Sequence, residues 1–228
     1  MPDIVTNLGK YKTLVFDCDG VILDLNKLKT EAFFQAALRY GEDHARFLVD
    51  YHRTRGGVSR FEKFRFFLDE YLGIDDPKGE HLDELLLSYA NIVTEGLCAC
   101  ACTPGLHDLR EQTADARWMI VSGGKQDELR NIFSLRKIDQ LFDAGIFGSP
   151  DTKGQIVERE LEKGTLRKDA LFFGDSEYDY RISRKYGLDF LFVSQWTEMP
   201  EWQFFCKTEG IEAIALVGDT LHPEKADV

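Results

Sequence analysis

Two aspartates one residue apart, Asp17 and Asp19, directly follow an apolar run in the stretch TLVFDCDGVILD, residues 13–24. Neighbouring carboxylates repel each other, and neutral residues could make the same turn before the chain becomes apolar again. We therefore expect a positively charged group to be bound between these two side chains.

A hydroxyl group and two glycines follow a second apolar run. Ser122, Gly123 and Gly124 come directly after residues 117–121. Glycine has no Cβ, so its backbone amide can approach an anion closely. This segment is therefore a candidate anion-binding loop.

A second pair of carboxylates and a lysine complete the set. Asp175 and Asp179 follow the apolar run at residues 170–173, and Lys153 lies where a helix is expected to begin. Carboxylate oxygens suit magnesium better than zinc or copper, and a phosphate is then the natural second ligand. One aspartate could attack phosphorus while another handles the proton of the leaving group.

These groups must be positioned by strands that alternate with helices. Such alternation predicts an α/β fold, a Rossmann-like parallel sheet with helices on both faces. Ligands of such sheets bind beyond the carboxyl ends of the strands, where the aspartates are expected. The expected strands are 12–16, 117–121, 170–173, 190–193 and 213–217, and Gly218-Asp219-Thr220 is expected to end the last one. One core helix is expected to begin near residue 103, with Thr103 as its cap. Two further core helices are expected at 126–135 and 153–162.

The order of these residues resembles that of the haloacid dehalogenase superfamily, in its phosphatase and phosphomutase branch. The matching motifs are Asp17-Cys18-Asp19-Gly20-Val21, then Ser122, then Lys153, then Gly174-Asp175 with Asp179. True dehalogenases of the superfamily lack the second aspartate of the first motif, so Asp19 indicates phosphoryl chemistry.

The resemblance implies a role for each of the four aspartates. Asp17 would be the nucleophile that forms an aspartyl phosphate, and Asp19 the general acid that later activates water. The magnesium ligands would be Asp17, the backbone carbonyl of Asp19, Asp175, and Asp179 directly or through water.

The remaining motif residues would contact the phosphate. Ser122 and Lys153 are the expected catalytic partners, and Gly20 and Gly123 are expected to bind substrate. The family commonly has proline after the lysine, whereas Gly154 follows it here. That departure concerns the local backbone more than the role of Lys153.

The distance between the first two motifs predicts an inserted domain. About 100 residues separate Asp19 from Ser122, whereas one crossover unit needs about 30. The surplus has helical patterns at 27–40, 43–52, 60–72 and 80–94. It resembles the family's helical cap, so we expect a core of 1–23 and 103–228 and an all-helical cap of 24–102.

An arginine-flanked glycine loop lies within this expected cap. The stretch RTRGGVSR, residues 53–60, is similar to the cap loop of β-phosphoglucomutases, where Gly-Val-Ser-Arg contacts substrate phosphate. On that basis Arg55 and Arg60 are candidate substrate-binding residues. The alternative is that Ser59 and Glu62 form a capping box and that Arg60 faces solvent.

Composition restricts the partners and the compartment. The net charge of −12 does not favour binding to nucleic acid or to an anionic membrane. The first residues do not resemble a signal peptide, and no apolar run approaches the length of a membrane span, so we expect a cytoplasmic monomer or homodimer. Five cysteines, three of them at 98, 100 and 102, are expected to be reduced and structural.

These observations together predict a magnesium-dependent phosphatase. Its substrate would be a small phosphorylated metabolite, such as a sugar phosphate or a phosphoglycolate-like compound. The alternatives are a phosphosugar mutase of the β-phosphoglucomutase type, a receiver-like signalling module that accepts a phosphoryl group, and a catalytically idle binding protein on the same scaffold.

Overall fold

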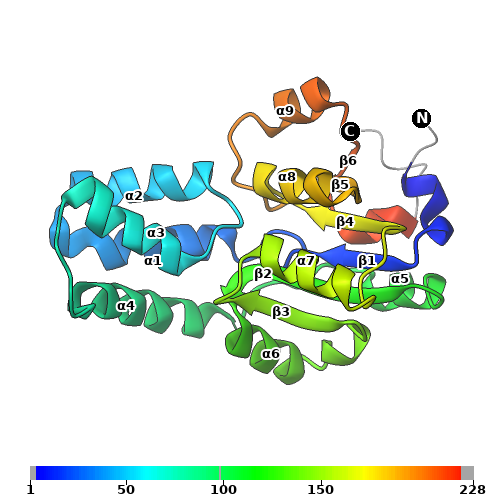
Figure 1. The fold of residues 1–228 in the computed structure, drawn as a ribbon, viewed down its shortest axis with the longest axis horizontal. Helices are drawn as coiled ribbons and strands as arrows, with labels where there is room; N and C mark the ends of the chain where they lie inside the picture. The colour runs from blue at the N-terminus through cyan, green and yellow to red at the C-terminus, as the bar shows by residue number, and fades with distance from the viewer. Residues whose placement is uncertain (1–3, 98, 222–228) are drawn as a thin grey trace.

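The structure is a computed structural model that describes residues 4–97 and 99–221. Within these residues, a six-stranded sheet has the order β3-β2-β1-β4-β5-β6, and all neighbouring strands are parallel (Figure 1). The direction of strand order reverses beside β1, where such sheets bind ligands. The strands are β1 Thr13–Phe16, β2 Arg117–Lys125, β3 Gly145–Ser149, β4 Ala170–Gly174, β5 Asp189–Val193 and β6 Ala213–Ile214.

Helices cover both faces of the sheet. They are α5 Leu106–Gln112, α6 Gln126–Leu135, α7 Lys153–Glu162, α8 Glu177–Tyr186 and α9 Trp202–Glu209. Leu14 and Phe16 of β1 pack in one apolar cluster with α5 and α6, whereas Val15 packs in a second cluster with α7, α8 and α9. Successive side chains of a strand point to opposite faces, so β1 must be apolar throughout. The predicted Rossmann-like α/β class is confirmed.

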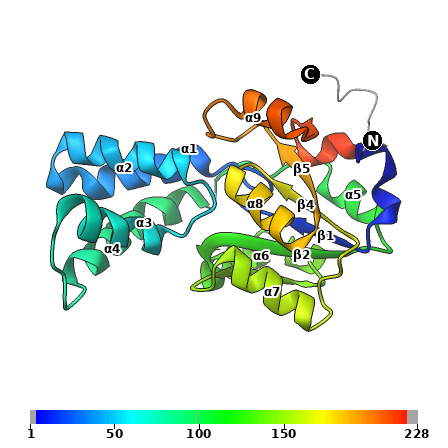
Figure 2. The ribbon, with the colours of Figure 1, turned by 45° about the horizontal axis from the view of Figure 1, so that its top comes forward.

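A helical insert separates β1 from the rest of the sheet in the sequence. It consists of α1 Asn26–Ala37, α2 Glu42–Thr54, α3 Arg60–Phe66 and α4 Glu80–Leu97, with a π-helical turn Phe67–Leu72 and a 3-10 turn Leu38–Tyr40. These helices enclose their own apolar cluster, which includes Phe33, Leu48, Phe64 and Tyr89. Figure 2 shows the insert projecting beyond one end of the sheet. The predicted all-helical insertion is confirmed.

The structure corrects three details at the edges of the core. The expected strand at 213–217 ends at Ile214, because the chain turns into the 3-10 helix Val217–Leu221, with the Asp219 carboxylate accepting a hydrogen bond from the Leu216 amide. Thr103 is not a helix cap; α5 begins after Gly105, which adopts a φ of 73°. The sheet also includes β3, which was not expected because its sequence, Gly-Ile-Phe-Gly-Ser, is short and only alternately buried.

Two further findings concern the membrane and the cysteines. In the part of the chain that the structure describes, no helix is long and apolar enough to cross a membrane. Cys98 lies outside the described residues. The thiol and carbonyl of Cys100 both accept hydrogen bonds from Arg136, as expected of a structural residue.

Candidate active site

The predicted residues meet at the carboxyl ends of the central strands. Asp17 and Asp19 follow β1, Ser122 lies in the carboxyl-terminal half of β2, and Asp175 follows β4. Asp179 is brought to the same place by α8, whose first turn is capped by Ser176: its hydroxyl accepts from the Asp179 amide. Parallel strands end at one edge of the sheet, so motifs far apart in the sequence share one crevice.

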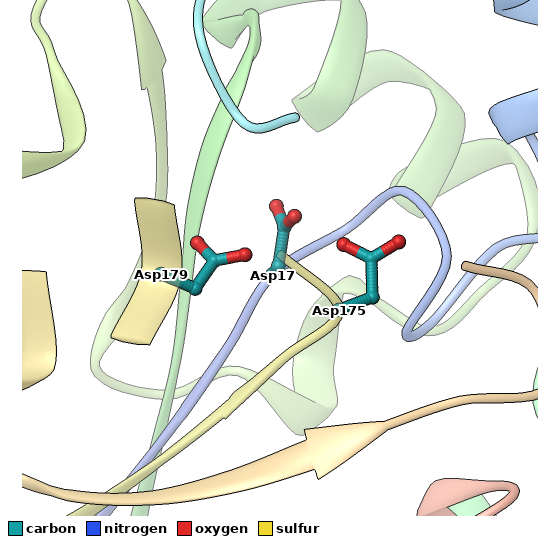
Figure 3. Close-up of side chains that lie close together, drawn as sticks. All are labelled: Asp17, Asp175 and Asp179. Atoms are coloured by element: carbon teal, nitrogen blue, oxygen red, sulfur yellow. The ribbon is translucent and has the colours of Figure 1, made fainter. Parts of the chain in front are cut away.

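Three of the carboxylates form a buried cluster. One oxygen each of Asp17, Asp175 and Asp179 lies within 4.8 Å of the others, and Figure 3 shows the three side chains pointing toward a common space. Burial, with a further contribution from neighbouring carboxylates, raises the pKa of Asp17 to about 7 and that of Asp175 well above its ordinary value. A set of close, desolvated carboxylates fits a hard divalent cation such as magnesium.

Lys153 is the positive charge within this cluster. Its buried Nζ lies 2.9 Å from Asp17 Oδ2 and 2.5 Å from Asp179 Oδ1. Burial opposes its charge, but these two carboxylates raise the net pKa of Lys153, so the lysine is cationic. A capping box between Thr152 and Gln155 begins α7 at Lys153, so the helix starts correctly with Gly154 in place of the family's proline.

Asp19 lies beside the cluster and has a different partner. Its Oδ2 accepts a hydrogen bond from Lys29 Nζ of α1 at 2.5 Å, while its Oδ1 is buried and has no hydrogen-bond partner. The Asp19 side chain is therefore not one of the three clustered carboxylates. Its Oδ1 remains available to a ligand in the site. Sequence reasoning missed Lys29, because a helical pattern does not reveal which side chain turns toward the core.

The absence of a side chain at Gly20 leaves space for the side chains of Asp175 and Asn26. It has a φ of +78°, and a Cβ placed on it would lie 2.1 Å from Asp175 Oδ2. That space is used by Asn26, whose Nδ2 donates to Asp175 Oδ2 at 2.6 Å. Asn26 was not anticipated, and no motif in the sequence indicated it.

A local hydrogen bond links Ser122 and Gly124 of the predicted phosphate loop. Ser122 is fully buried, and its Oγ accepts a hydrogen bond from the Gly124 amide at 3.0 Å. Gly123 lies in van der Waals contact range of the insert, since a Cβ on it would be 2.4 Å from the carbonyl oxygen of Gly57. Ser122 is therefore buried under the loop that it orders, and Gly123 lies at the boundary with the insert.

The arginine loop of the insert reaches the core. Ser59 caps α3 by accepting from the Glu62 amide, which is one of the two hydrogen bonds of the capping box in the alternative interpretation. Arg60 nevertheless does not face solvent: it is 16% exposed, and its Nη2 donates to Glu128 Oε1 of α6 at 2.6 Å. Its guanidinium also lies 5.2 Å from the ring centroid of Tyr89. Arg55 is exposed, with its guanidinium 5.7 Å from the Tyr51 ring.

A cavity of about 750 Å³ lies between the insert and the core. The core contributes Asp17, Asp19 and Asp175 to its wall, and the insert contributes both Arg55 and Arg60. A space of this size accommodates a small metabolite. The predicted cap loop and three of the predicted aspartates thus face the same cavity.

Residues 11–187 match the family model of the haloacid dehalogenase-like hydrolases. The chain belongs to this family. It is therefore a hydrolase of the haloacid dehalogenase type, and its buried aspartate cluster is of the phosphatase kind. The predicted enzyme class is confirmed at this level.

Solved structures of the same fold have low sequence identity to this haloacid dehalogenase-like hydrolase. A predicted phosphatase from Clostridium acetobutylicum is 19% identical with a TM-score of 0.70, over 96% of this chain and 99% of that one. A predicted phosphoglycolate phosphatase from Haemophilus somnus is 15% identical with a TM-score of 0.68, over 94% and 98%. CbbY from Rhodobacter sphaeroides, in complex with phosphate, is 15% identical with a TM-score of 0.69, over 96% and 100%. No curated protein matches the chain.

Proposed function

We propose that this hydrolase is a magnesium-dependent phosphatase of a small phosphorylated metabolite, which acts through an aspartyl phosphate on Asp17. The observation that carries the proposal is the position of Asp17. Its carboxylate lies 2.9 Å from the Lys153 ammonium group and has an oxygen within 4.8 Å of an oxygen of each of two further buried carboxylates. Asp19, with an unpartnered oxygen, stands beside it. A nucleophile, a cationic partner and a second carboxylate for proton transfer are thus gathered in one crevice.

Magnesium would be held by Asp17, Asp175, Asp179 and the backbone carbonyl of Asp19. Bound there, the cation neutralises charge on the phosphoryl group and offsets the repulsion among the carboxylates. The donor set supports this assignment, because three carboxylates that lie within 4.8 Å of one another are otherwise destabilised by burial.

Two steps account for the hydrolysis. Asp17 Oδ attacks phosphorus and the bond to the leaving oxygen breaks, while Asp19 gives its proton to that oxygen. Asp19, now ionised, takes a proton from water, and the hydroxide attacks phosphorus to release inorganic phosphate and free Asp17. Ser122, the Gly123 amide and Lys153 would hold the other phosphate oxygens and stabilise the charge that develops on them.

The insert, with proposed boundaries 24–102, would act as the cap. Its loop touches the core through Gly57, so it limits the access of bulk water to the phosphoryl group. Arg60 and Arg55 line the same cavity and are proposed to contact the substrate. The insert side of the cavity would select the leaving group, because the core side would bind the phosphoryl group.

A phosphosugar mutase is the second candidate. The observation that favours it is the position of the Gly-Val-Ser-Arg segment, residues 57–60, of which Gly57, Val58 and Arg60 lie in the wall of the cavity. A mutase would use the same aspartates but return the phosphoryl group to the sugar. A receiver-like module is disfavoured, because the chain has a helical insert between β1 and β2 and belongs to a hydrolase family.

The deciding experiment is phosphate release from a panel of phosphorylated metabolites with magnesium, with EDTA and Asp17→Asn as controls. Metal-dependent release from one or a few compounds, lost in the variant, supports the phosphatase. A sugar phosphate isomer in place of free phosphate would support the mutase. No turnover of any compound, with or without an added bisphosphate activator, would contradict both proposals.

A further inference from the structure

A buried lysine of the insert lies in the wall of the cavity, outside the catalytic set. Lys63 of α3 is only 2% exposed, and it lines the cavity together with His52 of α2. Its Nζ lies 2.7 Å from His52 Nδ1 and 5.5 Å from the ring centroid of Phe33. A lysine this deeply buried is unusual unless an anion accompanies it.

Among the residues that the structure describes, no carboxylate forms an ion pair with Lys63; the charges of Asp19 and Asp175 act on it only from farther away. Every charged residue that the insert contributes to the cavity wall is a cation: Lys29, Arg53, Arg55, Arg60 and Lys63. Three of them have carboxylate partners from the core, in the pairs Lys29–Asp19, Arg60–Glu128 and Arg53–Glu198. Among the ion pairs of the described residues, none includes Lys63.

The surroundings of Lys63 are suited to binding an anion. Burial, followed by the charge of Lys29, lowers the pKa of Lys63 to about 7. Burial and the neighbouring lysines also keep the pKa of His52 well below its ordinary value, so His52 is neutral. With its proton on Nε2, His52 accepts a hydrogen bond at Nδ1 from Lys63 and thereby orients the ammonium group. An anion placed beside Nζ would stabilise its charged form.

We propose that Lys63, oriented by His52, binds a second anionic group of the substrate, a carboxylate or a second phosphate in the leaving part of the molecule. This inference rests on the proposed phosphatase function and narrows its substrate class. The reacting phosphate would bind on the core wall among Asp17, Ser122 and Lys153. The second anion would bind on the insert wall of the same cavity, so the natural substrate would have an anion at each end.

The turnover experiment compares substrates that differ in one charged group. Phosphoglycolate is compared with 2-hydroxyethyl phosphate, and propane-1,3-diol bisphosphate with 3-hydroxypropyl phosphate. The wild-type enzyme is expected to prefer at least one anionic member by about tenfold or more in kcat/KM, as a charge-assisted hydrogen bond in a buried site would give. The pair that shows the preference tells whether the group is a carboxylate or a phosphate.

Variants assign this preference to Lys63. Lys63→Met keeps the length of the side chain and is expected to abolish the preference, with kcat/KM for the neutral-ended member changed by less than about threefold. Lys63→Arg retains the charge and is expected to keep part of the preference. Lys78→Met removes a charge from the same insert at a residue whose side chain is 81% exposed, and it should change nothing. A preference that survives in Lys63→Met would overturn the proposal.

A binding measurement separates this proposal from the phosphatase itself. Calorimetric titration of the wild-type enzyme with magnesium compares 3-phosphonopropionate with propylphosphonate, which cannot be hydrolysed. Tighter binding of the first by about tenfold, lost in Lys63→Met, would support the anion site even if no phosphate ester were turned over. Equal binding, or turnover of both members of each pair at equal rates, would overturn the anion site and leave the phosphatase proposal standing.

Discussion

The carbonyl oxygen of Gly57, in the insert, lies against Gly123, in the predicted phosphate loop of the core. A Cβ on Gly123 would be 2.4 Å from that oxygen, and a Cβ on Gly57 would be 3.2 Å from Lys153 Nζ. The insert and the catalytic core are therefore in contact at the site itself. This contact requires glycine on both sides, because a side chain on either residue would fill the space.

Gly57→Ala is expected to impair catalysis through this contact. Gly57 has a φ of +79°, and the added methyl group would also meet Tyr178 at 3.0 Å. Gly73→Ala is the matched control in the insert, because its φ is +66° but nothing lies within 4 Å of an added Cβ. Both variants should lose about 1 kcal/mol of stability from backbone strain, and only Gly57→Ala should lose about tenfold or more in kcat/KM. Equal kcat/KM in the two variants would show that the contact is dispensable.

Asp17→Asn is expected to abolish turnover and preserve the fold. The amide cannot form the aspartyl phosphate, so kcat should fall about a thousandfold or more. The unfolding temperature without metal should stay the same or rise, because one of three mutually repelling carboxylates is removed. Asp24→Asn, seven residues later and outside the cavity wall, is the control and should keep its activity. Retained activity in purified Asp17→Asn would refute the nucleophile assignment.

Arg60→Ala is expected to weaken binding of the natural substrate more than binding of a small ester. KM for the natural substrate should rise about tenfold, and KM for p-nitrophenyl phosphate about twofold or less, since the small ester does not reach the insert. Glu128→Gln breaks the same ion pair while it leaves the Arg60 charge in place. If both variants raised both KM values equally, Arg60 would act only by holding the insert to the core.

Magnesium should stabilise the protein more at high pH than at low pH. Burial raises the pKa of Asp17 to about 7 in the folded protein without metal. Between the lower pKa of the unfolded chain and about pH 7, the folded protein therefore holds a proton on Asp17 that the unfolded chain has lost. This proton stabilises the folded state at low pH, and the stabilisation is lost as the pH rises toward 7. Magnesium competes with these protons, so the gain in unfolding temperature should be larger at about pH 8 than at about pH 5.5. Asp175→Asn should lose most of that gain; an equal gain at both pH values would contradict the carboxylate assignment.

Lys63→Met should be more stable than the wild type, and this difference should depend on pH. Lys63 is surrounded by His52 of α2, Lys29 of α1 and, farther away, the core residues Asp19, Lys153 and Asp175. Its pKa is about 7 in the folded state and about 10.4 in the unfolded state, so the unfolded chain binds the extra proton between these values and wild-type stability rises with pH there.

The stability gain of Lys63→Met should therefore be a few kcal/mol at about pH 7 and below, and should shrink toward about pH 10. Denaturant unfolding at several pH values measures it, with Lys78→Met as the control. A variant less stable than the wild type at every pH would show that Lys63 is a structural residue.

The order of the motifs allowed the aspartate cluster to be predicted before any coordinates. Asp17 and Asp175 come together because parallel strands end at the same edge of a sheet, and local sequence patterns were sufficient to place both at such an end. Lys153 was placed only at the start of a helix, and its contact with Asp17 is a finding of the structure. The helical nature of the insert followed from the same kind of local pattern. The strand β3 escaped because its alternate burial and two glycines give no distinct signal.

Only the tertiary structure decided which residues of the insert face the aspartate cluster across the cavity. A helical pattern predicts α3, but it does not show that Lys63 and Arg60 point toward the cavity while Phe61 remains 48% exposed. The same holds for Lys29, which contacts Asp19 only because α1 packs beside the first motif. The sequence by itself determined which carboxylates lie at the ends of the core strands, because those ends follow from local apolar runs. The opposite wall of the cavity was decided only by the packing of the insert, which has its own apolar cluster, against the core, because those contacts join residues with no fixed spacing along the chain.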